Sequence, residues 1–441
     1  SALFFISITC YGQQGKLVPL QMERTSEYFI QNWTTEDGLT QNSVNDIVQT
    51  QDGYLWLATY GGLVRYDGVN FETYTIGNTP GLESNRIITL LETNSGSLWI
   101  GHREGGISIL EDGIFQTPKV LEDISKEFVQ DFCEDLDGNV WIATGDGLYK
   151  YSEGQLDKYH TVEGLPSSIV RRLFLHKSGA VHFVSDIEDQ PGLAHGFVFE
   201  GKIKVLKKYP TSERLNILDY NSRGELWMAY PDRVVMEKEG KVLKSFEFGK
   251  VDLGEVHTFL IDREGNIWLG SHQNVALITR EEAQNVQNGP VKLNKIYTYK
   301  RENDINRITQ DREGNIWVGT WKEGLFMFKK RVIKRYFPSV KSASSIYTKV
   351  APDGYGGIWF SAACHDLAHY INGEFSRYKS FEGCVRELYN DPANEAVIYV
   401  GVDSELGMIK DLRYEKLTDL EELLSENLYF SKITWSYSSL A

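Results

Sequence analysis

The sequence DREGNIWLG at residues 262–270 recurs almost unchanged as DREGNIWVG at residues 311–319. Looser copies of this stretch are centred on other tryptophans, namely Trp56, Trp99, Trp141, Trp227 and Trp359. His182 and Tyr399 take the place of the tryptophan in two more copies. The spacing of successive centres runs from 40 residues (Trp359 to Tyr399) to 49 residues (Trp268 to Trp317). Self-similarity at such a period indicates a repeat architecture.

Each repeat contains four short runs rich in β-branched and aromatic residues. In the first repeat we predict strands at 44–50, 54–59, 63–66 and 71–75. The Asp-Gly and Gly-Gly pairs between these runs allow the positive φ angles that tight hairpins need. One four-stranded sheet of this size cannot cover both of its faces, but sheets stacked around an axis can. The sequence therefore predicts an all-β protein with the β-propeller fold.

The repeat tryptophans are expected to pack between neighbouring sheets. At roughly 0.025 kcal/mol per Å², an indole that buries ~200 Å² contributes up to ~5 kcal/mol before the entropy cost is subtracted. A residue that recurs at one place in most repeats is better explained by such packing than by ligand contact.

The charge and the cysteines exclude several classes of partner and cofactor. A formal net charge of −15 disfavours nucleic acid as a partner. The basic run at 329–335 alternates with apolar residues, as expected of a strand with one solvated face. The four cysteines form no C-x-x-C pair, so no zinc or redox site and no cofactor is predicted. Cys133 lies in an apolar strand and is expected to be a buried thiol.

The first residues are typical of an export signal. Residues 3–9 are apolar and precede Cys10, and this resembles the end of a secretory signal peptide, so residues 1–14 are interpreted as its remnant. An ordinary buried strand, or a lipid-anchor cysteine at Cys10, is the alternative. No later run of 18 apolar residues is present that could span a membrane.

The repeat resembles a known family. Its pattern Asp-x-x-Gly-Asn-Ile-Trp-x-Gly-Thr, followed by Gly-Leu and an aromatic strand, is similar to the two-component regulator propeller repeat. The best match is WTTEDGLTQNSV at 33–44 with LVRYDGVNF at 63–71. The resemblance covers roughly residues 27 to 410 and implies the periplasmic sensor region of a hybrid two-component histidine kinase of the Bacteroidota type.

In that family two seven-bladed propellers precede a small β-sandwich, a membrane helix and a kinase. The resemblance therefore implies seven four-stranded blades followed by the first two blades of a second propeller. The first propeller is placed at 27–338, with its last outer strand at 332–337, and the start of a truncated second propeller at 339–441. A single nine-bladed ring is the alternative.

Successive turns of a four-stranded antiparallel sheet lie at opposite ends of the sheet. The Asp-x-x-Gly turns, which are nearly uniform, are expected on one face of the disc. The loops between the second and third strands vary from repeat to repeat and are expected on the other face, as a binding face should be. Repeat four also carries an insertion at 186–195, which is either decay or a specialisation for binding.

These variable loops supply the predicted ligand-binding residues. Aromatic faces stack on the C–H surfaces of sugars, while Asp, Arg and His bind hydroxyls or a uronate, and Trp321 is the strongest candidate. The alternative for each polar residue is that it is simply solvated. The predicted residues are Tyr60, His102, Arg103, Asp146, Asp186, Tyr230, His272, Trp321, Lys322 and His365.

Two further features of this face leave alternatives open. Cys364 and Cys384 are expected on the same face of adjacent repeats, where they form a disulfide in an oxidising compartment or remain two free thiols. No metal ligand set is predicted, although His102, His272 and His365 share the face and leave a metal or lyase site as an alternative.

We therefore predict a non-enzymatic, exported and membrane-tethered periplasmic sensor. It binds an oligosaccharide, its breakdown product or another small molecule, forms a homodimer through the receptor and regulates a downstream histidine kinase. It needs no cofactor and no nucleic acid, and it meets the membrane only through segments outside this sequence. Alternatives are a propeller lyase of the virginiamycin B type, which should end after seven repeats, a sensor attached to a diguanylate cyclase, and a pure scaffold.

Overall fold

The structure is a computed structural model of the 441-residue chain. The residues that it describes are 17–19, 22–24, 27–124, 126–213, 215–221, 224–248, 253, 255–272, 274–285, 288–290, 294–298, 304–331, 336–338, 347–362, 367–378, 384–391, 394–403 and 405–419. The proposed signal remnant at 1–14 and His365 lie outside these ranges.

The described residues form nine sheets of four or five strands, one for each repeat, and one two-stranded sheet. The prediction of an all-β propeller fold is confirmed. By its internal contacts the chain divides into two units, Tyr28–Lys330 and a second one made of Ser1–Glu27 with Arg331–Ala441.

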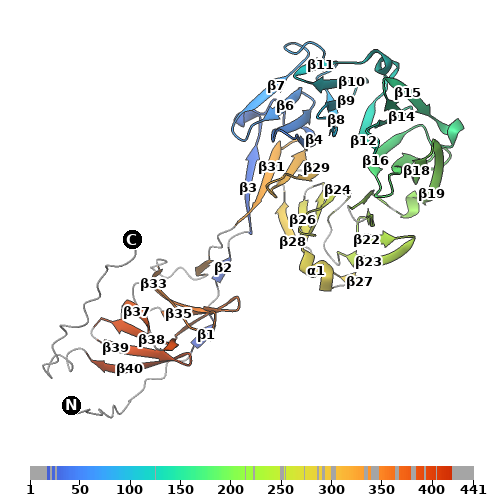
Figure 1. The fold of residues 1–441 in the computed structure, drawn as a ribbon. Coiled ribbons are helices and arrows are strands. Elements are labelled where there is room, and N and C mark those ends of the chain that lie inside the picture. Colours follow the sequence, from blue (N-terminus) through green and yellow to red (C-terminus); the bar gives the residue numbers. More distant parts are fainter. Residues whose placement is uncertain are drawn as a thin grey trace. The chain divides into compact units, whose positions relative to one another are not determined.

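The unit Tyr28–Lys330 arranges seven of these sheets in a ring, in chain order (Figure 1). Within the first six sheets the strand order follows the sequence, and in all seven the first strand of the repeat is innermost. The strands of repeats one to three are β4 (Val44–Gln49), β5 (Leu55–Thr59), β6 (Leu63–Tyr66), β7 (Phe71–Tyr74), β8 (Ile87–Glu92), β9 (Leu98–His102), β10 (Ile107–Glu111), β11 (Ile114–Gln116), β12 (Val129–Glu134), β13 (Val140–Thr144), β14 (Gly147–Ser152) and β15 (Gln155–Tyr159).

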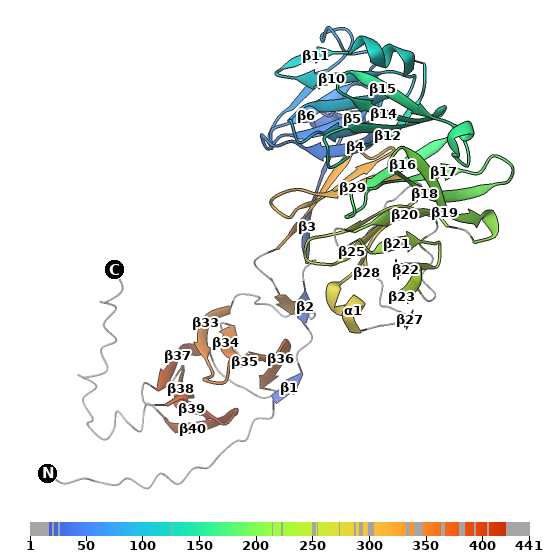
Figure 2. The same ribbon diagram turned by 45° about the vertical axis from the view of Figure 1, so that its right-hand side comes forward.

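Repeats four to six continue the ring (Figure 2). Their strands are β16 (Val170–Leu175), β17 (Val181–Asp186), β18 (Gly192–Phe199), β19 (Lys202–Pro210), β20 (Ile217–Tyr220), β21 (Leu226–Ala229), β22 (Arg233–Lys238), β23 (Lys241–Glu247), β24 (Val256–Ile261), β25 (Ile267–Ser271), β26 (Asn274–Ile278), β27 (Asn288–Pro290, parallel to β23) and β28 (Asn294–Thr298). The short helical segments are η1 (Thr35–Asp37), η2 (Lys119–Ile124), η3 (Thr161–Glu163), η4 (Thr211–Glu213) and α1 (Arg280–Asn285).

The seventh sheet closes the ring with a strand from the start of the chain. It contains β29 (Ile305–Gln310), β30 (Ile316–Thr320), β31 (Leu325–Lys330) and, as its outer strand, β3 (Tyr28–Trp33). The pairing runs from Tyr28 opposite Lys330 to Trp33 opposite Leu325. The outer strand expected at 332–337 was therefore wrong, because β3 already occupies the edge of β31.

The described end of that expected strand, β32 (Tyr336–Pro338), pairs instead with β2 (Met22–Arg24) in the second unit. The same unit holds repeats eight and nine as two sheets, and its N-terminal strand β1 (Leu17–Pro19) extends the sheet of repeat eight beside β36. The other strands are β33 (Tyr347–Pro352), β34 (Ile358–Ala362), β35 (Leu367–Ile371), β36 (Glu374–Tyr378), β37 (Val385–Asp391), β38 (Asn394–Val402), β39 (Glu405–Lys410) and β40 (Arg413–Asp419).

All seven repeat tryptophans are buried, as predicted. Each packs on the second strand of the following sheet. Trp56 of repeat one packs with Leu98 and Ile100 of β9. Trp317 of repeat seven packs with Leu55 and Leu57 of β5, so the last sheet packs on the first and closes the ring. Cys133 is a buried free thiol, as expected. Cys384 is disulfide-bonded, but Cys364 lies outside the described residues, so their pairing stays a prediction.

The Asp-x-x-Gly turn fixes the indole of its own repeat. In repeat six, Asp262 Oδ1 accepts the backbone N–H of Asn266 at 2.8 Å, and its Oδ2 accepts Trp268 Nε1–H at 2.8 Å. Gly265 closes the turn at a φ of 88°, a left-handed conformation that favours glycine. The same carboxylate-to-indole bond joins Asp135 to Trp141 and Asp311 to Trp317.

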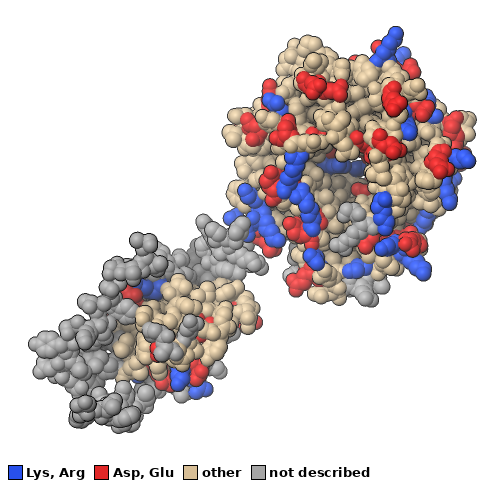
Figure 3. Space-filling model, viewed as in Figure 1, with Lys and Arg blue, Asp and Glu red and all other residues tan. Residues whose placement is uncertain are grey.

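Charged residues of the innermost strands meet near the axis of the first unit. In every sheet except that of β20, the pairing of the innermost strand with the second strand shifts register after the first residue of the innermost strand. Arg307 Nε lies 3.1 Å from Asp46 Oδ1 of the next sheet and also interacts with Asp131 and Asp219 from across the ring. Burial raises the pKa of Asp219 to about 6. Figure 3 shows the surface hollowed at the centre of this ring.

Candidate functional site

Three predicted residues meet on the loop face of the first unit. Trp321, in the loop between β30 and β31, packs edge-to-face on Tyr60, in the loop between β5 and β6, with ring centroids 5.4 Å apart. Arg103, in the loop after β9, donates a hydrogen bond from Nη1 to Tyr60 Oη at 3.1 Å. We call Trp321, Tyr60 and Arg103 the aromatic platform. It joins repeats seven, one and two.

Cationic side chains hold the platform in place. The guanidinium carbon of Arg86 lies 5.0 Å from the Tyr60 ring centroid, and that of Arg103 lies 5.7 Å from it. Arg86 is itself oriented by an ion pair of 3.1 Å with Glu104. The Trp321 side chain remains 40% exposed, so an indole stays available to a ligand while its neighbours are fixed. Lys322, the next residue, is also exposed.

A cleft of about 650 Å³ opens on the same face, between repeats four, five and six. Asp186, one of the predicted residues, lines it and is held by a two-point ion pair with Arg171, one bond of which measures 2.9 Å. The insertion of repeat four supplies one wall through residues 186–187 and 191–193, and residues 255–257 supply the opposite one. We call this the loop-face cleft. Part of the insertion is therefore built into a concave surface.

Other predicted residues are placed differently. Asp146 is on the surface, paired with Lys158 at 2.9 Å. Tyr230 is buried beneath the guanidinium of Arg233. His102 was expected on the exposed face, but its side chain is fully buried beside Ser108, with 3.0 Å between Nε2 and Oγ. Burial lowers the pKa of His102 to about 4, so this residue serves the core.

Comparison with known protein families points to the two loops that supply the rings of the aromatic platform. The sequence profile of the two-component regulator propeller matches residues 38–61 and 300–322. These two segments are similar to two-component regulator propeller repeats. These two matches include Tyr60 and Trp321, so the regulator propeller repeats contribute both rings of the aromatic platform. Among curated protein sequences, none matches this chain.

Solved structures share the fold of these regulator propeller repeats. The extracellular domain of one candidate hybrid two-component system from B. thetaiotaomicron has 18% identity and a TM-score of 0.62, and the match covers 90% of this chain and 55% of that one. A second such domain from the same organism has 17% identity and a TM-score of 0.55, and the match covers 87% of this chain and 52% of that one. The chain thus spans about half the length of these relatives.

Virginiamycin B lyase from Staphylococcus aureus has the fold as well. It shows 16% identity and a TM-score of 0.53 over 69% of this chain and 99% of its own. At these identities the likeness concerns the fold. No helix in the described part of the chain has the length and apolar character needed to cross a bilayer.

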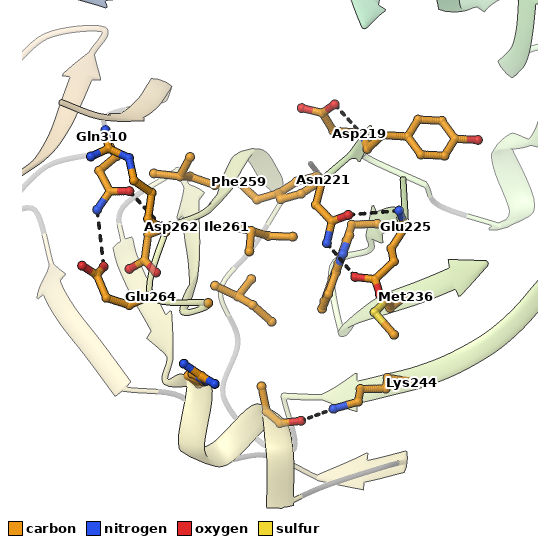
Figure 4. A pocket seen from close by; sticks show the side chains of 18 of the residues that line it. Asp219, Asn221, Glu225, Met236, Lys244, Phe259, Ile261, Asp262, Glu264 and Gln310 are labelled. Carbon is orange, nitrogen blue, oxygen red and sulfur yellow. Dashed lines mark hydrogen bonds between the residues drawn. The ribbon is translucent and has the colours of Figure 1, made fainter. Parts of the chain in front are cut away.

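The first unit also has a cavity of about 650 Å³ that contains none of the predicted residues (Figure 4). It lies at the Asp-x-x-Gly turns of repeats five and six, and its lining includes Trp227, Met236 and Ile261. Asn221 stands where other repeats have the turn aspartate, and Figure 4 shows it bonded to Glu225. Trp227 Nε1 has no hydrogen-bond partner among the described residues.

Proposed function

We propose that this chain is the ligand-sensing part of a bacterial two-component receptor and that it acts outside the cytoplasm. We further propose that the aromatic platform binds an oligosaccharide or its breakdown product. The observation that carries the proposal is the exposed indole of Trp321, held against Tyr60 in a variable loop of a regulator propeller repeat.

The chemistry of the platform suits a sugar. An exposed indole offers an apolar face for the C–H side of a pyranose ring, and the neighbouring guanidiniums of Arg86 and Arg103 offer donors for hydroxyls or a carboxylate. The loop-face cleft, with the Arg171–Asp186 pair on its wall, offers room for further residues of a longer ligand.

The position of the platform suggests how binding is transmitted. Trp321 belongs to the last sheet of the ring and Tyr60 to the first, so a ligand on both bridges the seam that β3 and β31 close. Binding would then favour the closed arrangement of this seam by the difference in its affinity for the two states. We propose that this bias, in a homodimeric and membrane-tethered receptor exported by a signal peptide, regulates a histidine kinase encoded downstream.

The test is glycan binding by the purified chain. We expect at least one plant, algal or host oligosaccharide to raise the melting temperature and to bind in calorimetry. Trp321→Ala should weaken that binding at least about tenfold, because a central aromatic anchor typically contributes more than the 1.4 kcal/mol that corresponds to tenfold. Leu136→Ala, at an exposed apolar residue in an Asp-x-x-Gly turn, is the matched control and should leave binding unchanged.

Two results would overturn the proposal: no glycan binds, or Trp321→Ala and Leu136→Ala behave alike. The lyase alternative is tested in the same mixtures. A sensor returns its ligand intact, whereas a lyase converts it to products that mass spectrometry detects.

A further inference from the structure

Two histidines and an aspartate converge where repeats six and seven meet on the loop face. His257 is the second residue of β24, His272 follows β25, and Asp304 immediately precedes β29. His257 Nε2 lies 3.3 Å from His272 Nδ1 and 3.7 Å from Asp304 Oδ1. His272 Nδ1 also contacts Asp304 Oδ1 directly. Three potential ligand atoms from three segments thus surround one point.

The cluster brings possible metal-binding atoms together. His272 Nδ1 faces both Asp304 Oδ1 and His257 Nε2. A ring nitrogen of neutral histidine that carries no proton has one in-plane lone pair, which can bind a metal. A cation between the three atoms would interact favourably with the carboxylate and with both ring nitrogens.

The distances agree with such a cation. In tetrahedral zinc sites, with bonds of about 2.0–2.1 Å, neighbouring ligand atoms lie about 3.3 Å apart. The two distances from His257 Nε2, 3.3 and 3.7 Å, are close to that value. The tighter contact between Asp304 and His272 would open by rotation of the carboxylate. Two imidazoles and a carboxylate are ligands that zinc and similar divalent metals accept.

The charge of the surroundings also favours a metal. Glu255 Oε2 lies 4.0 Å from His272 Nε2, and Glu255, His257 and His272 can offer ligand atoms that all lie within 4.8 Å of one another. Glu255 and Asp304 together supply two negative charges to balance a dication.

We propose that His257, His272 and Asp304, assisted by Glu255, form a binding site for a divalent transition metal of the zinc type. Glu255 and His257 also line the loop-face cleft. The metal would therefore have three protein ligands and one position directed to the cleft, where a carboxylate or hydroxyl of a ligand can bind. It would also tie repeat six to repeat seven. This site stands whether or not the platform binds sugars.

The experiment measures zinc binding by the full chain, with any affinity tag removed and the protein stripped with a chelator. We expect calorimetry to show one equivalent of Zn²⁺, and Co²⁺ to give the visible absorption of a tetrahedral site. Even outer-shell partners of a metal are worth about 10–100-fold in affinity, so loss of a ligand in His257→Ala or His272→Gln should cost at least about 100-fold. His160→Ala is the control histidine and should bind zinc as the unaltered chain does.

The variants also separate metal binding from folding. His272 is largely exposed, so His272→Gln should keep the melting temperature of the metal-free protein. Zinc should raise the melting temperature of the unaltered chain and of His160→Ala but not that of His272→Gln. Absence of stoichiometric zinc binding, or equal affinity in His272→Gln and His160→Ala, overturns the proposal.

Discussion

At the scale of single residues, one buried donor distinguishes the fifth repeat. In repeats three, six and seven an aspartate accepts the indole N–H, and the residue four positions later is an asparagine. In repeat five the acid and the amide have exchanged places, as Asn221 and Glu225. The exchange preserves the turn but leaves Trp227 Nε1 without a partner among the described residues.

We therefore predict that the double variant Asn221→Asp, Glu225→Asn stabilises the protein. An unsatisfied buried donor costs about 1–3 kcal/mol, so a gain of about 1–2 kcal/mol is expected. Urea unfolding measures it. The reverse exchange in repeat seven, Asp311→Asn with Asn315→Glu, should destabilise by a similar amount. If both variants change stability in the same direction, the explanation of the orphaned indole fails.

Residue patterns predicted the core better than the site. The repeat tryptophans were found because they recur in register. His257, Glu255 and Asp304 were not predicted, because they lie at the starts of innermost strands and not in the variable loops. A signal did exist: Arg171 pairs with Asp186 and His257 with His272, each 15 positions later in the chain. The second residue of an innermost strand therefore reaches its own repeat's loop.

At the scale of elements, the hairpin between β30 and β31 shows how the ring is closed. Gly324 has a φ of 82°, and a Cβ there would lie 2.0 Å from the carbonyl oxygen of Trp33 in β3. Gly314, in the Asp-x-x-Gly turn of the same repeat, has a φ of 87°, but a Cβ would meet only the Gln310 side chain, at 3.9 Å. The two glycines share the left-handed conformation, but a Cβ has room at Gly314 and no room at Gly324.

This pair gives a matched prediction. Gly314→Ala should cost roughly 1–3 kcal/mol, the strain of an alanine in the left-handed region. Gly324→Ala should cost clearly more, because the added carbon also displaces β3 from β31. Urea midpoints compare the two, and hydrogen exchange should locate the extra loss in β3. Equal costs would mean that the contact with Trp33 is unimportant.

Strand boundaries followed from local sequence, but the closing partner did not. In the first repeat the predicted strands at 44–50, 54–59, 63–66 and 71–75 agree within one residue with those observed. The outer strand of repeat seven was misplaced because residues 332–337 are rich in β-branched and aromatic residues, while the strand that holds this position lies far away in sequence. The hydrogen bond from Asn32 to the Glu323 carbonyl, for example, spans 291 positions. Periodicity carries no information about such a pairing.

At the scale of the whole molecule, buried histidines make stability depend on pH. His182 replaces the repeat tryptophan and contacts His195 at 3.0 Å. Burial lowers the pKa of His182 to about 3 and the pKa values of His195 and His102 to about 4. Below the ordinary histidine pKa of about 6.5 the unfolded chain takes up protons that the folded chain does not.

Stability should therefore fall as the pH is lowered from about 6.5 toward 4, by at most about 1.4 kcal/mol per pH unit for each histidine. Asp219, whose pKa is raised to about 6, acts in the opposite direction and offsets about one histidine. Urea unfolding at several pH values measures the slope. The double variant His182→Phe, His195→Leu should reduce it. An unchanged slope in the double variant would contradict the assignment.

The pairing of β3 with β31 also determines when the ring can close during synthesis. At about 5–20 residues per second, a ribosome needs on the order of tens of seconds between making the first of these strands and the last. During that interval the early segment is an open edge that can pair with other chains, and no earlier stopping point gives a finished ring. Keeping the nascent polypeptide unfolded until Lys330 has emerged would therefore prevent such wrong pairing. A shortened chain that ends before Lys330 should accumulate in aggregates.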